Sequence, residues 1–524
     1  MTNTVNRLLD EGLSLDYVGY DSADLESDEI LFCRFLNEVE NADFMTVIVH
    51  GDTSFFKKYN RFKESLESAD KSALLICTDD EVTRDYRHLF KGTDEEYLQA
   101  IRYMMLGGEN YRSLILWLLR KIDGAEVEVP DPIMPPTEGT YYPDRSDISF
   151  QSFLDNLDPF RPKIGVLFYQ KQWLTGNLDN IDGLIHAIEA QGCNPVPVFL
   201  QTYEDETTGA IGVKRVLREH LTRDGEPLLD AIVETMSFSQ ILIATPGSGE
   251  QVSDDNFLLD YGVPVIQAMT LASSEEAWRG SDAGLTPAEI AYDVVHPEFD
   301  GQIISVPSAS TERREDGTRY YRSIPERAER ISKTAMKWAR LRRIPNSDRR
   351  VAVIMYMYPP KNANAGGASG LDTFSSVVDL LHRMRDEGYD TGDSIPETSE
   401  ELVAILMSGL TNDTSWLSED AIRERALDTV GTDLYGGWYG GLSDDSRSRI
   451  EKGWGKPPGD FYTVDGRLTI PGRMFGNVYV GFQPDRGRDI QSDYHDPHTV
   501  MPHQYLAYYR WVEHVFGADA VVHV

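Results

Sequence analysis

The carboxyl-terminal segment of the chain concentrates the side chains that are best suited to metal or proton chemistry. The stretch "YHDPHTVMPHQYLAYYRWVEHVFGADAVVHV" (494–524) contains five of the eleven histidines in the 524-residue sequence. They are His495, His498, His503, His514 and His523. Imidazole is the commonest protein metal ligand, and its charge changes near neutral pH. We therefore ask whether this segment holds a metal, moves protons or does neither.

The spacing of these histidines argues against a stable zinc site. His503 follows a proline and opens a predicted helix, and His514 lies about three turns further along that helix. No HxxxH or HExxH pair occurs, so no two histidines share a helical face at ligand spacing. His523 ends an apolar strand, where a histidine can be structural or can face a ligand. The pattern favours a site where one histidine and a carboxylate transfer protons, or where a metal is held transiently.

A glycine-rich loop is the second candidate. The stretch "YPPKNANAGGASGLD" (358–372) lies between a predicted strand and a predicted helix, where open α/β sheets bind ligands. Gly366 and Gly367 would let the backbone approach a substrate, and Asp372 stands at the start of the helix, so all three are candidate substrate-binding residues. The loop is neither a Walker A sequence nor GxGxxG. The alternative is a connecting loop without a ligand.

Two further stretches carry polar groups at predicted strand ends. "GNVYVGFQPDRGRD" (476–489) places Asn477, Gln483 and Arg486 around a strand and the turn after it, and Arg486 could pair with a carboxylate. These three are candidate substrate-binding residues. "PEFDG" (297–301) offers Glu298 and Asp300, which we expect to face water on a turn.

The elements that must position these residues follow a repeated plan. Three segments begin with a β-branched or aromatic apolar run, continue through a polar loop and end in an amphipathic helix. The segments start near residues 43, 163 and 350. This is the βα unit of a parallel sheet, so the predicted fold class is multidomain α/β with several such units. The region 395–460 in the C-terminal third is predicted to be rich in helices, and the end of the chain reads strand, helix, strand.

Composition marks the boundaries. We predict an N-terminal α/β domain over 1–130, a Pro-rich linker over 131–149, a second α/β domain over 150–310 and a third domain over 311–524. The third domain opens with a long helical pattern that ends at Pro345.

Bulk composition excludes several classes of protein. The formal net charge is −36, spread along the chain, with 14 Lys against 36 Arg. Such a surface opposes binding to nucleic acid or to anionic membranes and resembles the acidic proteomes of halophiles. No apolar run is long enough to span a bilayer, and the N-terminus lacks a secretory pattern. Three scattered cysteines suit a reducing cytoplasm, which is the expected location.

Taken together, the stretches resemble a family. The chain resembles the large subunit of aerobic cobaltochelatase and, more distantly, that of magnesium chelatase, from about residue 160 onward. The stretches that carry the resemblance are "GVPVIQAMT" (262–270), "VVHPEFDGQI" (294–303), "KWARLRRIPNSDRRVAVIMYMYPP" (337–360), "GGASGLDTFSSVVDLLHRMRDEGY" (366–389), "WGKPPGD" (454–460), "GNVYVGFQPDRG" (476–487) and the final 31 residues.

The resemblance implies a function. Such a subunit binds a tetrapyrrole similar to hydrogenobyrinic acid diamide. Together with an AAA+ ATPase subunit and a second small subunit, it inserts a divalent metal in an ATP-dependent reaction. Cobalt, for cobalamin biosynthesis, is the expected metal, and magnesium is the alternative. ATP would be hydrolysed by the partner, which agrees with the missing Walker A loop. His503 and His523 would act in catalysis, and His495 and His523 would contact the metal transiently.

One departure from the family concerns the end of the chain. In the family, the stretch that matches "VVHV" runs into a Gly-x-His-Gly segment, which does not follow here. We therefore expect either an N-terminal fragment of a large subunit, truncated at its C-terminal end, or one half of a split subunit whose other half is a separate chain. Two alternatives remain open: a noncatalytic fragment that binds tetrapyrrole or partner subunits, and a tandem α/β glycosyltransferase that uses a nucleotide sugar.

Overall fold

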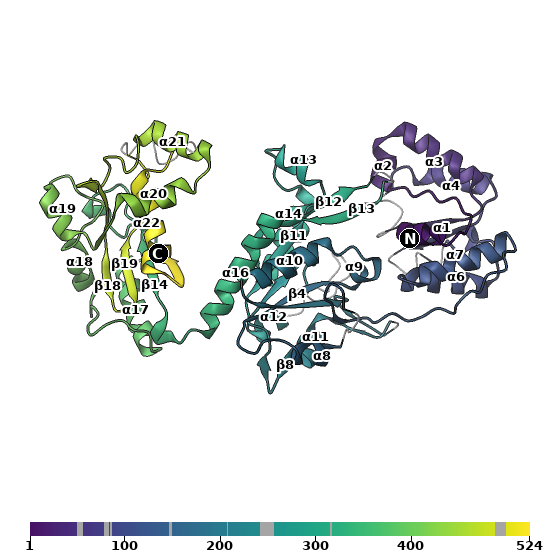
Figure 1. Cartoon of the computed structure of the whole chain (residues 1–524), viewed down its shortest axis with the longest axis horizontal. Helices are drawn as coiled ribbons and strands as arrows, with labels where there is room; N and C mark the ends of the chain where they lie inside the picture. Colours follow the sequence, from purple (N-terminus) through teal and green to yellow (C-terminus); the bar gives the residue numbers. More distant parts are fainter. Residues whose placement is uncertain are drawn as a thin grey trace. The chain divides into compact units, whose positions relative to one another are not determined.

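The chain folds into two compact units, Met1–Ala339 and Arg340–Val524. The computed structural model describes residues 1–49, 56–77, 83, 86–145, 149–206, 208–241, 256–314, 317–487 and 499–524. Figure 1 shows both units as mixtures of helices and strands. Within these described ranges, no helix combines the length and the hydropathy that a bilayer crossing requires.

The first unit begins with a small parallel sheet and its helices. Strands β1 and β2 pair in parallel, from Met45 opposite Ala73 to Val49 opposite Cys77. The helix between them buries Phe62 and Leu66 against this sheet, as a βα unit requires. The elements are α1 (Thr2–Asp10), α2 (Ser22–Ser27), α3 (Glu29–Asn41), β1 (Met45–Val49), α4 (Tyr59–Ser68), β2 (Ala73–Cys77), η2 (Arg87–Leu89), α6 (Asp94–Leu106) and α7 (Asn110–Ile122).

A seven-stranded sheet forms the larger part of the first unit. Its order is β13-β12-β11-β10-β4-β5-β3, with five parallel strands in the centre and an antiparallel strand at each edge. Its strands are β3 (Gly139–Thr140), β4 (Lys163–Tyr169), β5 (Asn194–Leu200), β10 (Ala231–Glu234), β11 (Val265–Thr270), β12 (Ile303–Arg313) and β13 (Arg319–Ser323).

Helices cover both faces of this sheet, which explains why its strands are continuous apolar runs. On one face, α10 and α16 bury Ile181, Leu184 and Ile331 with Val166 of the sheet. On the other face, α8, α11 and α12 pack against Leu167 and its neighbours. The helices and remaining short elements are α8 (Phe150–Asp155), α9 (Gln170–Thr175), α10 (Asp179–Ala190), β6 (Glu204–Asp205), β7 (Ala210–Ile211), α11 (Gly212–His220), β8 (Thr222–Arg223), β9 (Glu226–Pro227), α12 (Phe257–Tyr261), α13 (Glu275–Arg279), α14 (Pro287–Ile290), the π-helical η3 (Ala291–Val295), α15 (His296–Phe299) and α16 (Pro325–Arg343).

The second unit is built on a four-stranded sheet of order β18-β19-β14-β20. Strand β14 (Val351–Met355) lies in parallel between β19 (Val478–Phe482) and β20 (Ala520–His523), and β18 (Arg473–Phe475) runs antiparallel to β19. The other elements are η4 (Asn346–Asp348), η5 (Asn362–Asn364), α17 (Thr373–Asp386), α18 (Ser399–Met407), α19 (Glu419–Arg425), β15 (Asp428–Val430), α20 (Thr432–Gly440), α21 (Asp444–Trp454), β16 (Thr463–Val464), β17 (Arg467–Ile470), α22 (His503–Trp511) and the π-helical η6 (Val512–Phe516).

The predicted α/β class with several parallel βα units is confirmed, and so is the helix-rich segment, which holds α18 to α21. The predicted domain division stays a prediction. Its linker contains β3, which joins the seven-stranded sheet, and its 310/311 boundary lies within β12. The prediction that Asp300 faces water is wrong, because this side chain is only 3% exposed and accepts hydrogen bonds from residues 239 and 240.

Close packing of α10 on the edge strand β13 gives a test of this fold. A Cβ added at Gly183 would lie 2.0 Å from Ser323 Oγ and 2.6 Å from Ser323 Cβ. We expect Gly183→Ala to destabilise the chain by about 1–3 kcal/mol, since overpacking forces the helix away from the sheet. Thermal unfolding monitored by circular dichroism measures this loss of stability.

The matched control is Gly437→Ala in helix α20, where an added Cβ meets no atom within 4 Å. This change should leave stability unaltered or raise it by about 0.5–1 kcal/mol, the helix-propensity difference between the two residues. Equal melting temperatures for the two variants would contradict the described packing of α10.

Candidate functional site

The carboxyl ends of three parallel strands meet at one edge of the second unit. Gln483, which follows β19, donates its backbone N–H to Met355 O at 2.8 Å, so the sheet continues beyond the strands. Helix α17 packs on one face of β14, and α22 packs on the other. Connections that leave a parallel sheet on opposite faces open a crevice at its carboxyl edge, where such folds bind ligands.

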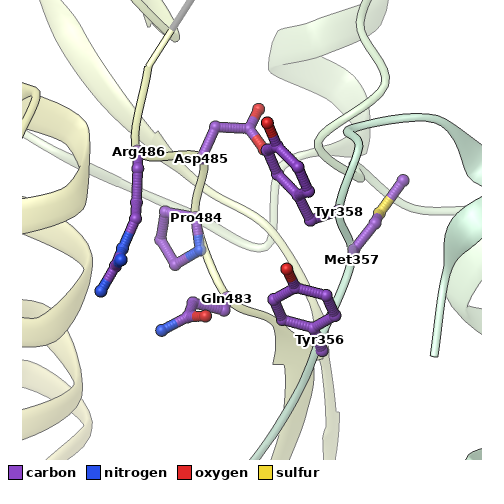
Figure 2. Close-up of a pocket in the computed structure, with 7 residues that line it drawn as sticks. All are labelled: Tyr356, Met357, Tyr358, Gln483, Pro484, Asp485 and Arg486. Carbon is purple, nitrogen blue, oxygen red and sulfur yellow. The ribbon is translucent and has the colours of Figure 1, made fainter. Parts of the chain in front are cut away.

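A cavity of about 380 Å³ lies at this edge. Its lining residues come from the two segments that continue β14 and β19 (Figure 2). They are Tyr356, Met357, Tyr358, Gln483, Pro484, Asp485 and Arg486. The rings of the two tyrosines lie 6.3 Å apart at 42° and form an aromatic wall. The cavity therefore combines flat apolar surface with a few polar groups, as small-molecule sites do.

Asp485 is the most unusual polar group in this cavity. Its side chain is only 4% exposed, and its Oδ1 has no hydrogen-bond partner in the described part of the chain. Its Oδ2 lies 2.5 Å from the hydroxyl of Tyr462. Burial raises the pKa of Asp485 to about 7, although the contact with Tyr462 opposes that rise. A carboxyl with this pKa gains and loses a proton near neutral pH.

The hydroxyl of Tyr462 has one proton and two oxygen neighbours. It lies 2.5 Å from Asn412 O as well as 2.5 Å from Asp485 Oδ2. One O–H cannot donate to both oxygens. When Asp485 is protonated, its own O–H can donate to the phenol oxygen while Tyr462 donates to Asn412 O. Hydrogen bonds to both oxygen neighbours of the phenol therefore form together only when Asp485 is protonated, in agreement with its raised pKa.

Gln483 connects the cavity to helix α22. Its Nε2 donates to the hydroxyls of Tyr505 and Tyr509, each at 3.1 Å. The ring of Tyr509 lies in turn against the imidazole of His523, with centroids 6.2 Å apart and an angle of 25°. The structure thus brings Gln483, Arg486 and His523 into one neighbourhood, of which the first two line the cavity.

The glycine-rich loop folds back on the segment after β14. Gly366 donates its N–H to Tyr356 O at 2.8 Å and has φ +68°, and a Cβ there would lie 2.9 Å from the ring of Phe374. Asp372 caps helix α17 by accepting from the backbone and hydroxyl of Ser375, which lowers the pKa of Asp372. Neither these residues nor Gly367 line the cavity, so their role in binding substrate stays a prediction.

His503 is held inside the fold. It is 2% exposed, its Nδ1 lies 2.7 Å from the hydroxyl of Tyr435, and its Nε2 lies 3.0 Å from Gly455 O. Because a carbonyl only accepts, Nε2 carries the proton and Nδ1 accepts from the tyrosine. Burial lowers the pKa of His503, which favours this neutral form. Both ring nitrogens are occupied, and the catalytic role of His503 stays a prediction.

The remaining predicted residues are dispersed. Asn477 precedes β19 at the opposite edge of the sheet and donates its side-chain N–H to Ser347 O at 2.9 Å. His514 lies against the ring of Trp438. His495 and His498 lie outside the described residues. Among the residues that are described, no three His, Cys, Asp or Glu side chains gather closely enough to hold a metal ion.

Sequence reasoning missed Asp485, Tyr462 and the tyrosine pair. A usable signal existed for most of them, because Tyr356 and Tyr358 directly follow a predicted strand and Asp485 stands between Gln483 and Arg486. Tyr462 gives no such signal, since it comes from the turn before β16 and reaches Asp485 only through the tertiary fold.

Similarity to known proteins agrees with this architecture. A family model described as CobN/Magnesium Chelatase matches residues 101–524, so the match begins earlier than the resemblance at about residue 160. An uncharacterized protein of Methanocaldococcus jannaschii is 31% identical over 507 residues, which are 94% of this chain and 41% of the relative. The aerobic cobaltochelatase subunit CobN of Pseudomonas aeruginosa is 29% identical over 96% of this chain and 39% of its own length.

A solved structure is similar over nearly the whole chain. The catalytic subunit of cobaltochelatase from Mycobacterium tuberculosis superposes with a TM-score of 0.67 at 27% sequence identity. The superposition covers 95% of this chain and 40% of that protein. The chain therefore spans about two fifths of the length of the relatives it matches.

The raised pKa of Asp485 predicts how the stability of the second unit changes with pH. An unfolded aspartate titrates near pH ~3.9, whereas the folded group titrates at about 7. The folded state therefore holds an extra proton between these values, and the stabilisation that this proton provides is lost as pH rises through about 7. The free energy of unfolding of Asp485→Asn, relative to that of wild type, should therefore increase by roughly 2 kcal/mol as the pH rises from 5 to 8. Native-state hydrogen exchange of the β14 and β19 amides measures this gain.

Asp372→Asn is the matched control. The pKa of Asp372 is lowered, so its stabilisation is present above the ordinary aspartate pKa and is lost on acidification. Between pH 5 and pH 8 the stability of this variant relative to wild type should therefore stay constant, and the difference should change only at acidic pH, where the wild type loses this stabilisation. A constant difference between wild type and Asp485→Asn across this pH range would contradict the buried, titrating carboxyl.

Proposed function

The chain belongs to the CobN/magnesium chelatase family, and from this premise we propose that it is the tetrapyrrole-binding part of a metal chelatase large subunit. In this proposal, cobalt is inserted into a tetrapyrrole similar to hydrogenobyrinic acid diamide, in the cytoplasm, for cobalamin biosynthesis. Magnesium is the alternative metal. An AAA+ ATPase subunit hydrolyses the ATP, and a second small subunit completes the complex.

The observation that carries this proposal is the cavity between the ends of β14 and β19. It offers an aromatic wall for a flat conjugated ring and an exposed arginine for an acidic arm of the macrocycle. It also holds Asp485, a buried carboxyl with one unpartnered oxygen among the described residues. The cavity volume lies near the lower end of the ~300–1,000 Å³ typical of ligand pockets, so it suits an edge of a macrocycle.

Metal insertion requires a proton acceptor. The divalent cation takes the place of inner N–H protons of the macrocycle, so protons are released from the ring nitrogens as the metal enters. Asp485 can accept one of them when it is ionised, and its pKa of about 7 matches the task near neutral pH. Tyr462 stabilises both protonation states, because its hydroxyl can donate to the carboxylate or accept from the acid.

The other roles are assigned from position. Arg486 binds an acidic arm, and Gln483, fixed by two tyrosines, presents its amide at the cavity wall. His523 acts next to the metal or the transferred proton. Its ring lies against that of Tyr509, and cobalt accepts an imidazole nitrogen as a transient ligand. His495 could serve as a second transient ligand, and it lies outside the described residues.

A second candidate is a noncatalytic role, in which this chain binds tetrapyrrole and the chemistry takes place elsewhere. The observation that favours it is the buried position of His503, both of whose ring nitrogens are occupied by Tyr435 and Gly455. The glycosyltransferase alternative is not retained, because the chain belongs to a chelatase family.

Binding of a tetrapyrrole gives the first test of the proposal. The purified chain, titrated with hydrogenobyrinic acid diamide at high salt, should show saturable quenching of tryptophan fluorescence. Arg486→Ala should weaken binding about tenfold, because a charge-assisted hydrogen bond is worth about 1.5–3 kcal/mol. The control is Arg383→Ala on helix α17, where the arginine side chain is 74% exposed and pairs with Glu387. Quenching that is absent or equal in both variants would refute the assigned pocket.

Proton transfer gives the second test. In the assembled chelatase complex, Asp485→Asn should lower the rate of metal insertion about 10²-fold or more while tetrapyrrole affinity stays close to that of wild type. The wild-type rate should rise with pH through about 7, as the carboxyl ionises, and the variant should lose this dependence. Asp379→Asn, which changes an exposed carboxylate on helix α17 in the same unit, should keep the wild-type profile. An unchanged profile in Asp485→Asn would support the noncatalytic role.

A further inference from the structure

The seven-stranded sheet of the first unit has its own crevice, which the proposed function does not use. Its parallel strands lie in the order β5-β4-β10-β11-β12, which is 2-1-3-4-5 along the chain. Connections leave this sheet on opposite faces between β4 and β10, and ligands of such folds bind outside the carboxyl ends of these strands. Near the carboxyl ends of these strands lie Glu234, Gln240, Gln267, Asp293 and Asp300, together with the rings of Phe238 and Tyr292. We refer to these seven residues as the switch-point cluster.

Buried polar side chains fill the switch-point cluster without satisfying one another. Glu234 and Gln267 stand opposite each other on neighbouring strands, and both are 0% exposed. Gln240, which is 3% exposed, has no partner for either amide atom in the described part of the chain, and neither Glu234 Oε2 nor Gln267 Oε1 has one there. Burying polar atoms without hydrogen bonds costs free energy, so these groups do not serve the stability of the fold.

The carboxyl groups of the cluster are buried away from cationic side chains. Burial raises the pKa of Glu234, Asp293 and Asp300, and the charges and hydrogen bonds that act on these three acids include no lysine or arginine from the described part of the chain. The amide of Gln240, unpartnered among the described residues, both donates and accepts hydrogen bonds. The cluster therefore suits polar groups such as a carboxamide or a carboxyl.

Backbone strain and exposed aromatic rings lie directly beside these groups. Phe238, four residues after Glu234, has φ +70°, which is a true outlier for a bulky residue, and its ring is 47% exposed. It lies 4.4 Å from the ring of Tyr292, which is 42% exposed and belongs to the π-helical η3. The backbone N–H of Phe238 donates to Tyr292 O at 2.8 Å, which fixes the strained conformation. Backbone strain and π-helical turns both concentrate at functional sites.

These features together select a class of ligand. A metal ion is disfavoured, because no three His, Cys, Asp or Glu side chains come together among the described residues. A free anion is disfavoured as well, because no lysine or arginine among the described residues acts on the three acids. A flat ring could stack on Phe238 and Tyr292, and the amide of Gln240, two residues after Phe238 in the chain, could bind a polar arm of that ring.

We propose that the switch-point cluster of the first unit is a second ligand site, which takes a planar conjugated ring bearing carboxamide or carboxylic acid arms. The identity of the ring as a tetrapyrrole rests on the proposed function. Phe238 and Tyr292 bind the ring face, and Gln240 together with Glu234 recognises one arm.

The test compares stability with binding in the full-length chain. Phe238→Gly relieves the positive φ, and Gln240→Leu replaces an unpartnered amide by an apolar group of similar size, so both variants should melt no lower than wild type. Both should nevertheless bind hydrogenobyrinic acid diamide about fivefold or more weakly in the fluorescence titration. Phe160→Gly, which removes a phenylalanine that is 88% exposed just before the amino end of β4, is the control and should bind normally.

Hydrogen exchange locates the effect. In wild type, the ligand should protect amides within 231–241 and 291–302, and this protection should disappear in Phe238→Gly. Unchanged affinity in both variants, or no protection of these segments, would overturn the second site. If Arg486→Ala alone loses binding, the second site fails and the proposed pocket stands. If only the two switch-point variants lose binding, the second site stands and the proposed pocket fails. A wild-type chain that is folded and binds no tetrapyrrole would overturn both.

Discussion

Burial of strand β14 on both faces is the constraint on which the second unit depends. Val351, Val353 and Met355 enter the core under α17, whereas Ala352 and Ile354 enter the core under α22. All five side chains are nearly or fully inaccessible to solvent. A one-residue slip of this strand would exchange the two cores and would move every group at its carboxyl end. The cavity between β14 and β19 is therefore positioned by alternation in one short strand.

The two units position polar residues in the same way, but the types of these residues differ. Each places polar residues immediately after buried parallel strands, where backbone hydrogen bonding is already satisfied and side chains are held by rigid elements. In the second unit the polar residues include an arginine and a titrating aspartate beside an aromatic pair. In the first unit they are amides and buried acids whose pKa burial raises, beside a strained phenylalanine. The fold supplies the position in each case, and the residue types decide what can bind.

The periodicity of the sequence was sufficient to predict the parallel units, because strands buried on both faces read as unbroken apolar runs such as "VAVIM". It also indicated Gln483 and Arg486, which follow such a run. It could not place His503, whose partners lie 68 and 48 residues away in the chain. It could not reveal that Asp300 is buried either, since that burial depends on the segment after β10, which folds back over the turn. Contacts between distant segments, and not local pattern, decide whether a polar residue is structural or functional.

The single proton of Tyr462 links the charge of Asp485 to the position of a neighbouring loop. When Asp485 is ionised, the phenol O–H turns towards the carboxylate and no longer holds Asn412 O. The side chain of Asn412 donates at 2.7 Å to Gln483 O in the cavity wall. Loss of the proton from Asp485 therefore frees Asn412 O from the phenol, while the contact of Asn412 with Gln483 O remains, and return of the proton restores both. The charge of Asp485 is thus coupled, through the orientation of one hydroxyl, to the residue that supports the backbone of the cavity wall.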